Sequence, residues 1–160
     1  MRKSLLLLFV FIVFGASAHA QSFNLKELLT FKDHDNVFFH DYVSKKGYTY
    51  EKSKYDEKKE NYAYVFLKDI AEDLHEIAYA VTNKGVRVTF ATTDVKDYEE
   101  IKKQLELLEF HFVKFAPKQE HGRSVLMMMY TDGHTEVDLY NSYIEDEDHA
   151  LVRFYRVKVH

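Results

Sequence analysis

The fold is decided by residues 86–112, which read VRVTFATTDVKDYEEIKKQLELLEFHF. The first five alternate apolar and polar side chains, a period of two that is typical of a β-strand. Asp94 then stands where an N-cap is needed, and apolar residues recur at three- and four-residue spacing, which predicts an amphipathic helix. We expect this helix to pack on a sheet through Ile101, Leu105 and Leu108. The alternation resumes after the helix, so the stretch predicts a domain of the α+β class.

The same strand pattern continues on both sides of this stretch. Short runs rich in aromatic and β-branched residues predict eight strands, at 48–54, 62–68, 76–82, 86–92, 110–115, 124–131, 135–143 and 150–157. Because the loops between most of these strands are short, we expect antiparallel pairing. The helices would then gather on one face of an antiparallel sheet.

Two further helices are predicted before the first strand. Asn24 and Glu27 form a capping-box pattern at the start of one, and Asp33 or Asp35 can cap the other. Gly47 stands where a helix ends with a left-handed residue. Helical sequence followed by four strands therefore occurs twice, which predicts a weak internal repeat with half-units of about 21–93 and 94–160.

The first 20 residues have the features of a signal peptide. Arg2 and Lys3 precede an apolar run over residues 5–14, and Ala18-His19-Ala20 supplies small residues at both positions that signal peptidase recognises. The apolar run is about half as long as a bilayer-spanning helix requires. We therefore expect cleavage after Ala20 and a periplasmic or secreted protein in which residues 21–160 form a single α+β domain.

Composition narrows the function classes. The chain is 46% hydrophobic and 16% aromatic, which predicts a substantial core, and it has no cysteine. A lipid-anchored cysteine, a thiol nucleophile and thiolate metal sites are thereby excluded. Loss of the leader would leave 20 basic and 26 acidic residues, a net charge of −6, so we expect no nucleic-acid partner. A second apolar stretch long enough for a stable membrane anchor is absent from the sequence.

Three sequence segments carry a resemblance to known proteins. They are the junction Lys45-Lys46-Gly47-Tyr48, the helical stretch from Asp97 to Leu105, and Phe110-His111-Phe112. With the leader and the closing hairpins, they resemble small exported proteins of unknown function from Gram-negative bacteria. The layout of two helix-plus-four-strand units is also similar to that of a tandem-repeat β-lactamase inhibitor protein, which binds its target on an open sheet face. This second resemblance concerns the layout alone.

Catalytic and metal-binding motifs are sparse. Eight histidines lie beyond the leader, and none has the spacing of a local metal site. Glu136 and Asp138 leave the same face of a predicted strand, a geometry open to acid/base work, but a solvated strand face explains them as well. We expect no catalytic residues, no metal site and no cofactor.

Aromatic and basic residues on the strands give the strongest functional signal. If Val88 and Phe90, and on the last strand Val152 and Phe154, face the helices, strand alternation places other side chains on the opposite, open face. The predicted binding residues on that face are Tyr62, Tyr64, Arg87, Tyr140, Arg153 and Tyr155. Tyrosine and arginine are enriched at protein interfaces, although tyrosine is also simply a good strand residue.

These patterns favour an exported, non-enzymatic protein that binds another macromolecule, with a protein the expected partner, through an open sheet face. A periplasmic immunity or inhibitor protein directed against a toxin or hydrolase is the main alternative, since it too needs only a surface. An unrecognised hydrolase that uses Glu, Asp and His residues is a third possibility.

Overall fold

The computed structural model describes residues 22–56, 61–70, 73–120, 123–145 and 151–160. The predicted signal peptide lies outside the described residues. The elements, in chain order, are α2 (Leu25–Lys32), α3 (Asn36–Lys45), β1 (Thr49–Asp56), β2 (Asn61–Ile70), β3 (Asp73–Thr82), β4 (Gly85–Thr92), α4 (Val95–Leu107), β5 (His111–Glu120), β6 (Arg123–Thr131), β7 (Glu136–Glu145) and β8 (Leu151–Val159). The predicted α+β class is confirmed.

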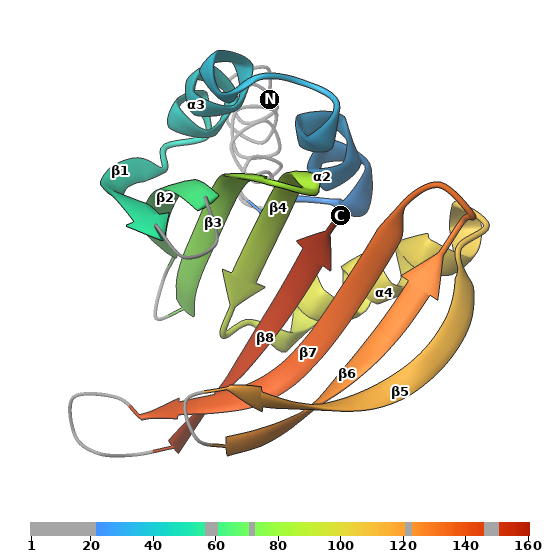
Figure 1. The fold of residues 1–160 in the computed structure, drawn as a ribbon. Helices are drawn as coiled ribbons and strands as arrows, with labels where there is room; N and C mark the ends of the chain where they lie inside the picture. The colour runs from blue at the N-terminus through green and yellow to red at the C-terminus, as the bar shows by residue number, and fades with distance from the viewer. Residues whose placement is uncertain (1–21, 57–60, 71–72, 121–122, 146–150) are drawn as a thin grey trace, which may run out of the picture.

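All eight strands form one antiparallel sheet (Figure 1) in the order β1-β2-β3-β4-β8-β7-β6-β5. Each half of the chain supplies a four-stranded meander, and the two meanders meet where β4 pairs with β8. Descent of the two halves from one repeated unit stays a prediction.

The helices begin where the sequence provides caps. Asn24 and Glu27 form a complete capping box at the start of α2, with N···O distances of 2.9 Å in both directions. The Asp35 side chain accepts from the backbone N–H of Phe38 at the start of α3. Asp94 caps α4 by accepting from the N–H of Lys96. The predicted caps Asn24, Asp35 and Asp94 are thereby confirmed.

The junctions α3–β1 and α4–β5 share one backbone geometry. Gly47 and Glu109 occupy the left-handed region, with φ angles of 84° and 61°. The next residue in each case, Tyr48 or Phe110, donates its N–H to the carbonyl five residues back, at 3.1 and 2.9 Å. This is the Schellman pattern, which satisfies carbonyls at the end of a helix and turns the chain into the following strand.

The three helices cover one face of the sheet. Helices α2 and α4 pack mainly against β4 and β8, and Phe39 of α3 contacts the rings of Phe66 and Tyr79 on β2 and β3. The largest side chains of this core are fully buried and come from both halves of the chain; among them are Leu25, Leu28, Phe31, Phe39, Phe66, Ile77, Phe90, Ile101, Leu105 and Leu139.

Helix α4 uses two of the three predicted core residues. Ile101 and Leu105 are buried, but Leu108 is 39% exposed, so its assignment to the core is wrong. Leu108 is the C-cap, and its backbone angles are no longer those of a helix. This turns its side chain away from the apolar face that Ile101 and Leu105 form. Tyr98, one turn before Ile101, is buried and completes the contact.

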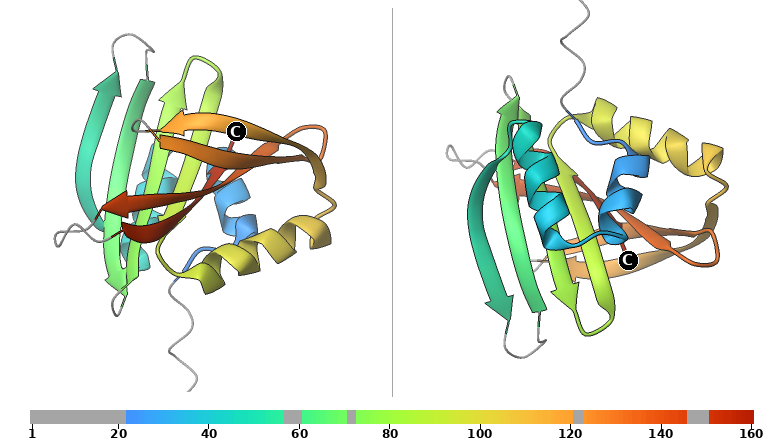
Figure 2. Two further views of the ribbon diagram at one scale, coloured as in Figure 1. Left: turned by 90° about the horizontal axis from the view of Figure 1, so that it is seen from below. Right: turned by 90° about the horizontal axis from the view of Figure 1, so that it is seen from above.

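The opposite face of the sheet has no cover from α2, α3 or α4, yet parts of it are buried. Val65, Ala91, Val125 and Phe154 are all less than a tenth exposed and alternate with helix-facing neighbours. The sheet twists strongly, so that the outer strands of the two halves run in different directions (Figure 2). Side chains on this helix-free face therefore cover one another, and the face is less open than the sequence suggested.

Candidate functional site

The six predicted binding residues do not share one face. Arg87 and Tyr140 lie on the helix-free face, whereas the other four lie on the helix side; these are Tyr62, Tyr64, Arg153 and Tyr155. The expectation of one continuous surface built from all six is wrong.

The alternation predicted for the last strand is inverted. Tyr155 is only 5% exposed and its ring stacks on that of Tyr98 from α4, with centroids 4.7 Å apart. Phe154, predicted to face the helices, lies on the helix-free side instead. Arg153, two residues before Tyr155, also points to the helix side. It stays exposed because it lies beyond the part of β8 that the helices cover.

On β2, the two predicted tyrosines also face the helix side. Tyr64 packs against the main core, and the rings of Tyr62 and Tyr64 lie 4.8 Å apart. Tyr62 is exposed because it lies near the start of β2, away from the part of the strand that packs against the core.

Tyr140 is on the predicted face but is almost completely buried. Its ring lies under two ammonium groups, those of Lys158 and Lys118, at 4.2 and 4.9 Å from the centroid. Lys118 also donates to the Tyr140 hydroxyl at 3.1 Å. Tyr140 therefore supports a polar cluster rather than presenting its ring to a partner.

A surface that sequence analysis did not single out lies on the helix side of β5–β8. Phe112, Phe115 and Leu126 are 47%, 59% and 53% exposed, and Tyr143 is also exposed. The strand register places them on one face beside Arg153, away from the sheet centre that α2 and α4 cover. We refer to Phe112, Phe115, Leu126, Tyr143 and Arg153 as the outer aromatic surface.

A β-bulge assembles the edge of this surface. The register of β5 and β6 shifts between Phe112 and Lys114, so that Phe112 pairs with Tyr130 and Phe115 with Met128. Three residues apart in sequence, Phe112 and Phe115 would point to opposite faces of a regular strand. The bulge returns them to one face, where their rings lie 4.7 Å apart.

The other end of the surface is built on a cation–aromatic pair. The guanidinium group of Arg153 lies 5.5 Å from the centroid of the Tyr143 ring and donates to the Tyr143 hydroxyl at 3.0 Å. This pair holds a positive charge at the border of an apolar area.

The backbone edge of β5 is a poor site for adding a strand. Strand β5 is the last in the sheet and carries the bulge, Lys114, Pro117 and Lys118. Lysine, proline and bulges on an edge strand discourage pairing with other chains. A partner would therefore contact the side chains of this surface rather than extend the sheet.

A second cluster of functional groups lies on the helix-free face, at the junction of β7 and β8. Glu136, Asp138 and His160 each place one potential ligand atom within 4.8 Å of the others. The Asp138 Oδ2 atom lies 3.1 Å from both His160 Nε2 and the Tyr140 hydroxyl, which donates to it. The pair of carboxylates can be recognised in the sequence but the histidine cannot, because only strand pairing brings residue 160 to them.

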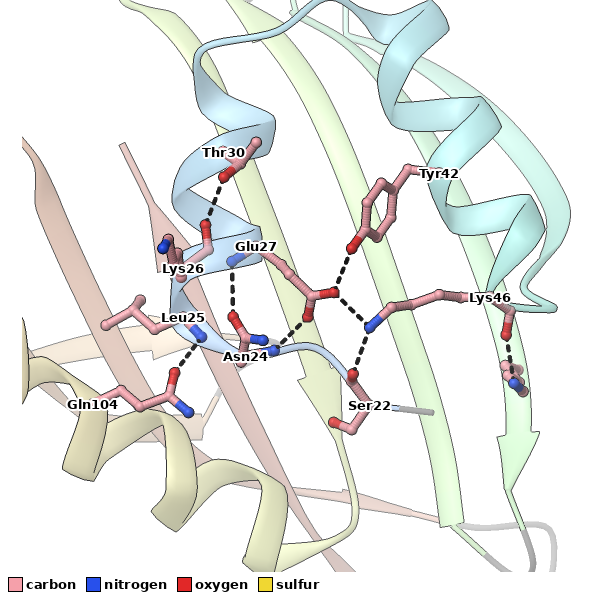
Figure 3. Close-up of polar contacts among 10 residues, drawn as sticks. Ser22, Asn24, Leu25, Lys26, Glu27, Thr30, Tyr42, Lys46 and Gln104 are labelled. Atoms are coloured by element: carbon pink, nitrogen blue, oxygen red, sulfur yellow. Dashed lines mark hydrogen bonds and ion pairs between the residues drawn. The ribbon is translucent and has the colours of Figure 1, made fainter. Parts of the chain in front are cut away.

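A third polar group surrounds Glu27 between α2 and α3 (Figure 3). Its carboxylate accepts from the Tyr42 hydroxyl and pairs with Lys46, both at 2.7 Å, and Lys46 also donates to the Ser22 carbonyl at 2.9 Å. Burial raises the pKa of Glu27, but the hydrogen bonds from Lys46, the Asn24 N–H and Tyr42 outweigh it and hold this pKa below its usual value. The hydrogen bond to Glu27 in turn raises the pKa of Tyr42 to about 12.

The Glu27 network has the character of a structural clamp. It joins the segment before α2 to the end of α3, and both carboxylate oxygens of Glu27 are engaged (Figure 3). A pocket of about 340 Å³ lies beside it, lined also by Asp97 and Glu100.

Comparisons with protein-family models, curated proteins and solved structures found no match for this chain. Among the described residues, none of the helices has both the length and the apolar character needed to cross a membrane.

Proposed function

We propose that this chain is an exported, non-enzymatic protein that binds a partner protein through the outer aromatic surface. The observation that carries the proposal is the group Phe112, Phe115 and Leu126, three large apolar side chains that are each about half exposed on one sheet face. Scattered exposed apolar residues need no explanation, but a contiguous patch is typical of an interaction site.

The composition of the surface favours a protein partner. Phenylalanine, tyrosine, methionine and arginine are enriched at protein interfaces, and Met128 and Tyr130 extend the patch toward the core. The aromatic rings offer contact area at small entropic cost, since few rotatable bonds are fixed on binding. Arg153 at the border selects for a partner that presents an acidic group beside an apolar area.

Export rests on the leader, whose short apolar core favours cleavage after Ala20 over retention as an anchor. The resemblance to small exported proteins of Gram-negative bacteria agrees with this location. Mass spectrometry of the exported protein should find a chain that begins at Gln21. Recovery of the full-length chain from the membrane fraction would contradict export with cleavage.

The binding proposal is tested by photo-crosslinking in the exporting cell. A photoreactive phenylalanine analogue at position 115 should crosslink to a specific partner, whereas the same analogue at Leu107 should not. Leu107 is a matched control, because it is apolar and 79% exposed but lies on α4, outside the surface.

The purified partner then provides the affinity measurement. A Phe115→Ser, Leu126→Ser double variant should bind it at least about tenfold more weakly, while Leu107→Ser binds like the wild type. Equal affinity for all three proteins would refute the proposed surface. If the captured partner is a toxin or hydrolase that the protein inhibits, the immunity or inhibitor alternative is correct for the same surface.

Self-association is a separate outcome. Sedimentation of the purified protein should show a monomer, because the proposal assigns the surface to a different chain. A dimer that dissociates in the double variant but not in Leu107→Ser would show that the surface joins two copies instead.

A further inference from the structure

We infer that Glu136, Asp138 and His160 form a binding site for a divalent transition-metal ion, with Zn²⁺ the best match. The three side chains come from β7 and from the end of β8, and their potential ligand atoms lie within 4.8 Å of one another. This site is independent of the outer aromatic surface and lies on the other face of the sheet.

The strand register explains why the three residues meet. Glu136 and Asp138 are two apart on β7 and therefore point to the same face. Pairing of Val137 with Val159 places His160 next to Glu136, and the His160 N–H donates to the Glu136 carbonyl at 2.9 Å. The backbone thus fixes all three positions before any metal binds.

The decisive observation is an unsatisfied oxygen on Asp138. This residue is only 4% exposed, and its Oδ1 atom is buried without a hydrogen-bond partner. Leaving a buried acceptor unpaired is costly, and more so when it belongs to a charged group. A cation bound by both oxygens of this carboxylate, Oδ1 together with Oδ2, would remove that cost.

The geometry suits a small ion. Zinc binds imidazole nitrogen and carboxylate oxygen at about 2.0 to 2.2 Å, which places two ligand atoms of a tetrahedral site about 3.4 Å apart. The observed distance between His160 Nε2 and Asp138 Oδ2 is 3.1 Å, close to that value. The Glu136 carboxylate, on a half-buried residue, lies within 4.8 Å of the other two ligand atoms, and a change of its side-chain torsions would bring it into the same shell.

Hydrogen bonds from neighbouring residues hold the Asp138 carboxylate in position, as they do for carboxylate ligands in metal sites. The Tyr140 hydroxyl donates to Asp138 Oδ2, and Lys118 in turn donates to that hydroxyl. Hydrogen bonds of this kind orient a ligating carboxylate. An imidazole ligand favours zinc and its neighbours over Mg²⁺ or Ca²⁺, which prefer all-oxygen sites.

The site is accessible from solvent. Glu136 and His160 line a pocket of about 410 Å³ together with Thr82, Val86 and Arg87. Three protein ligands leave at least one coordination position for water or for a group entering through this pocket.

The test is calorimetric titration of chelator-treated, full mature protein with ZnCl₂. Wild type should bind one ion per chain at this site, and Glu136→Gln with His160→Gln should lower the affinity at least about tenfold. The matched control is Asp132→Asn with His134→Gln, an exposed acid and histidine in the turn before β7, which should leave the affinity unchanged.

A second variant distinguishes loss of zinc binding from loss of the fold. Asp138→Asn removes the buried charge, so the metal-free variant should melt no lower than wild type, while the rise in melting temperature on adding Zn²⁺ disappears. Failure of wild type to bind zinc, or equal affinity in the Glu136→Gln, His160→Gln variant, would overturn the inference. Neither result would bear on the binding of a partner protein by the opposite face.

Discussion

Tyr155 of β8 stacks on Tyr98 of α4, with their ring planes 29° apart. The contact joins the helix between the two meanders to the strand at the centre of the sheet. It also fixes which residues of β8 face the core, since Val157 and Val159 follow Tyr155 on the same side.

Loss of the Tyr155 ring should destabilise the fold strongly. Tyr155→Ala leaves a cavity against Tyr98 and should lower the free energy of unfolding by about 3 to 5 kcal/mol, as for other buried aromatic residues. Arg153→Ala, two residues earlier and exposed, should stay within about 0.5 kcal/mol of wild type. Urea denaturation measures both values, and equal effects would contradict the face assignment of β8.

Substitutions in helix α4 should likewise cost much stability at buried positions and little at exposed ones. Ile101→Ala and Leu105→Ala should each cost about 2 to 5 kcal/mol because both side chains are fully buried. Leu108→Ala and Lys103→Ala should change stability by no more than about 0.5 kcal/mol. A large loss at Leu108 would show that the C-cap packs on the sheet after all.

The two helix-to-strand junctions should respond in opposite directions to substitution. Glu109→Gly relieves a left-handed non-glycine residue and should raise stability by about 0.5 to 1 kcal/mol. Gly47→Ala should lower it, because φ is 84° there and the added Cβ would lie 3.2 Å from the Lys68 Nζ atom. Thermal unfolding of the two variants checks the signs, and a loss of stability in Glu109→Gly would argue against strain at that residue.

Mild acid should weaken the fold through His75. Burial lowers the pKa of this histidine, although Asp97, Asp73 and Asp94 act in the opposite direction. Below about pH 6.5 the unfolded chain therefore binds a proton that the folded chain does not, and stability falls with pH. Denaturation at pH 7.5 and 5.5 should show a smaller difference in His75→Gln than in wild type, whereas exposed His134→Gln should keep the full difference.

The Glu27 clamp should matter at a lower pH. Because the folded pKa of Glu27 is depressed, its contribution is present above the ordinary carboxyl range and is lost as pH falls below about 4.5. At neutral pH, Lys46→Met leaves the carboxylate without its cation and should cost about 1 to 3 kcal/mol. Lys45→Met, the exposed neighbour, is the control, and an equal cost in both variants would rule out a specific clamp.

Local patterns were sufficient to predict the helices and the strands. The caps Asn24, Asp35 and Asp94 and the alternation over residues 86–90 depend on near neighbours only, and the structure has them where they were expected. Strand faces were harder to predict. In β8 the decisive signal is Val157 and Val159 alternating with charged residues, but the prediction relied on Val152 and Phe154 at the other end of the strand.

The candidate sites depend on strand register and on packing between elements, which no local pattern contains. In β2 both faces are apolar, so only the contact of Phe66 with Phe39 decides the side on which Tyr62 and Tyr64 lie. The bulge at Val113 and the register of β7 with β8 likewise create the outer aromatic surface and the Glu136–Asp138–His160 cluster.

The pairing of β4 with β8 also sets the order in which the chain can fold. During synthesis or passage through a membrane, β4 is complete long before the residues that will cover its free edge. The central part of the sheet can close only when residues 151–159 have arrived, and such long-range strand pairing is slow. For a chain that we propose is exported, the complete sheet can therefore form only after most of the polypeptide has been translocated.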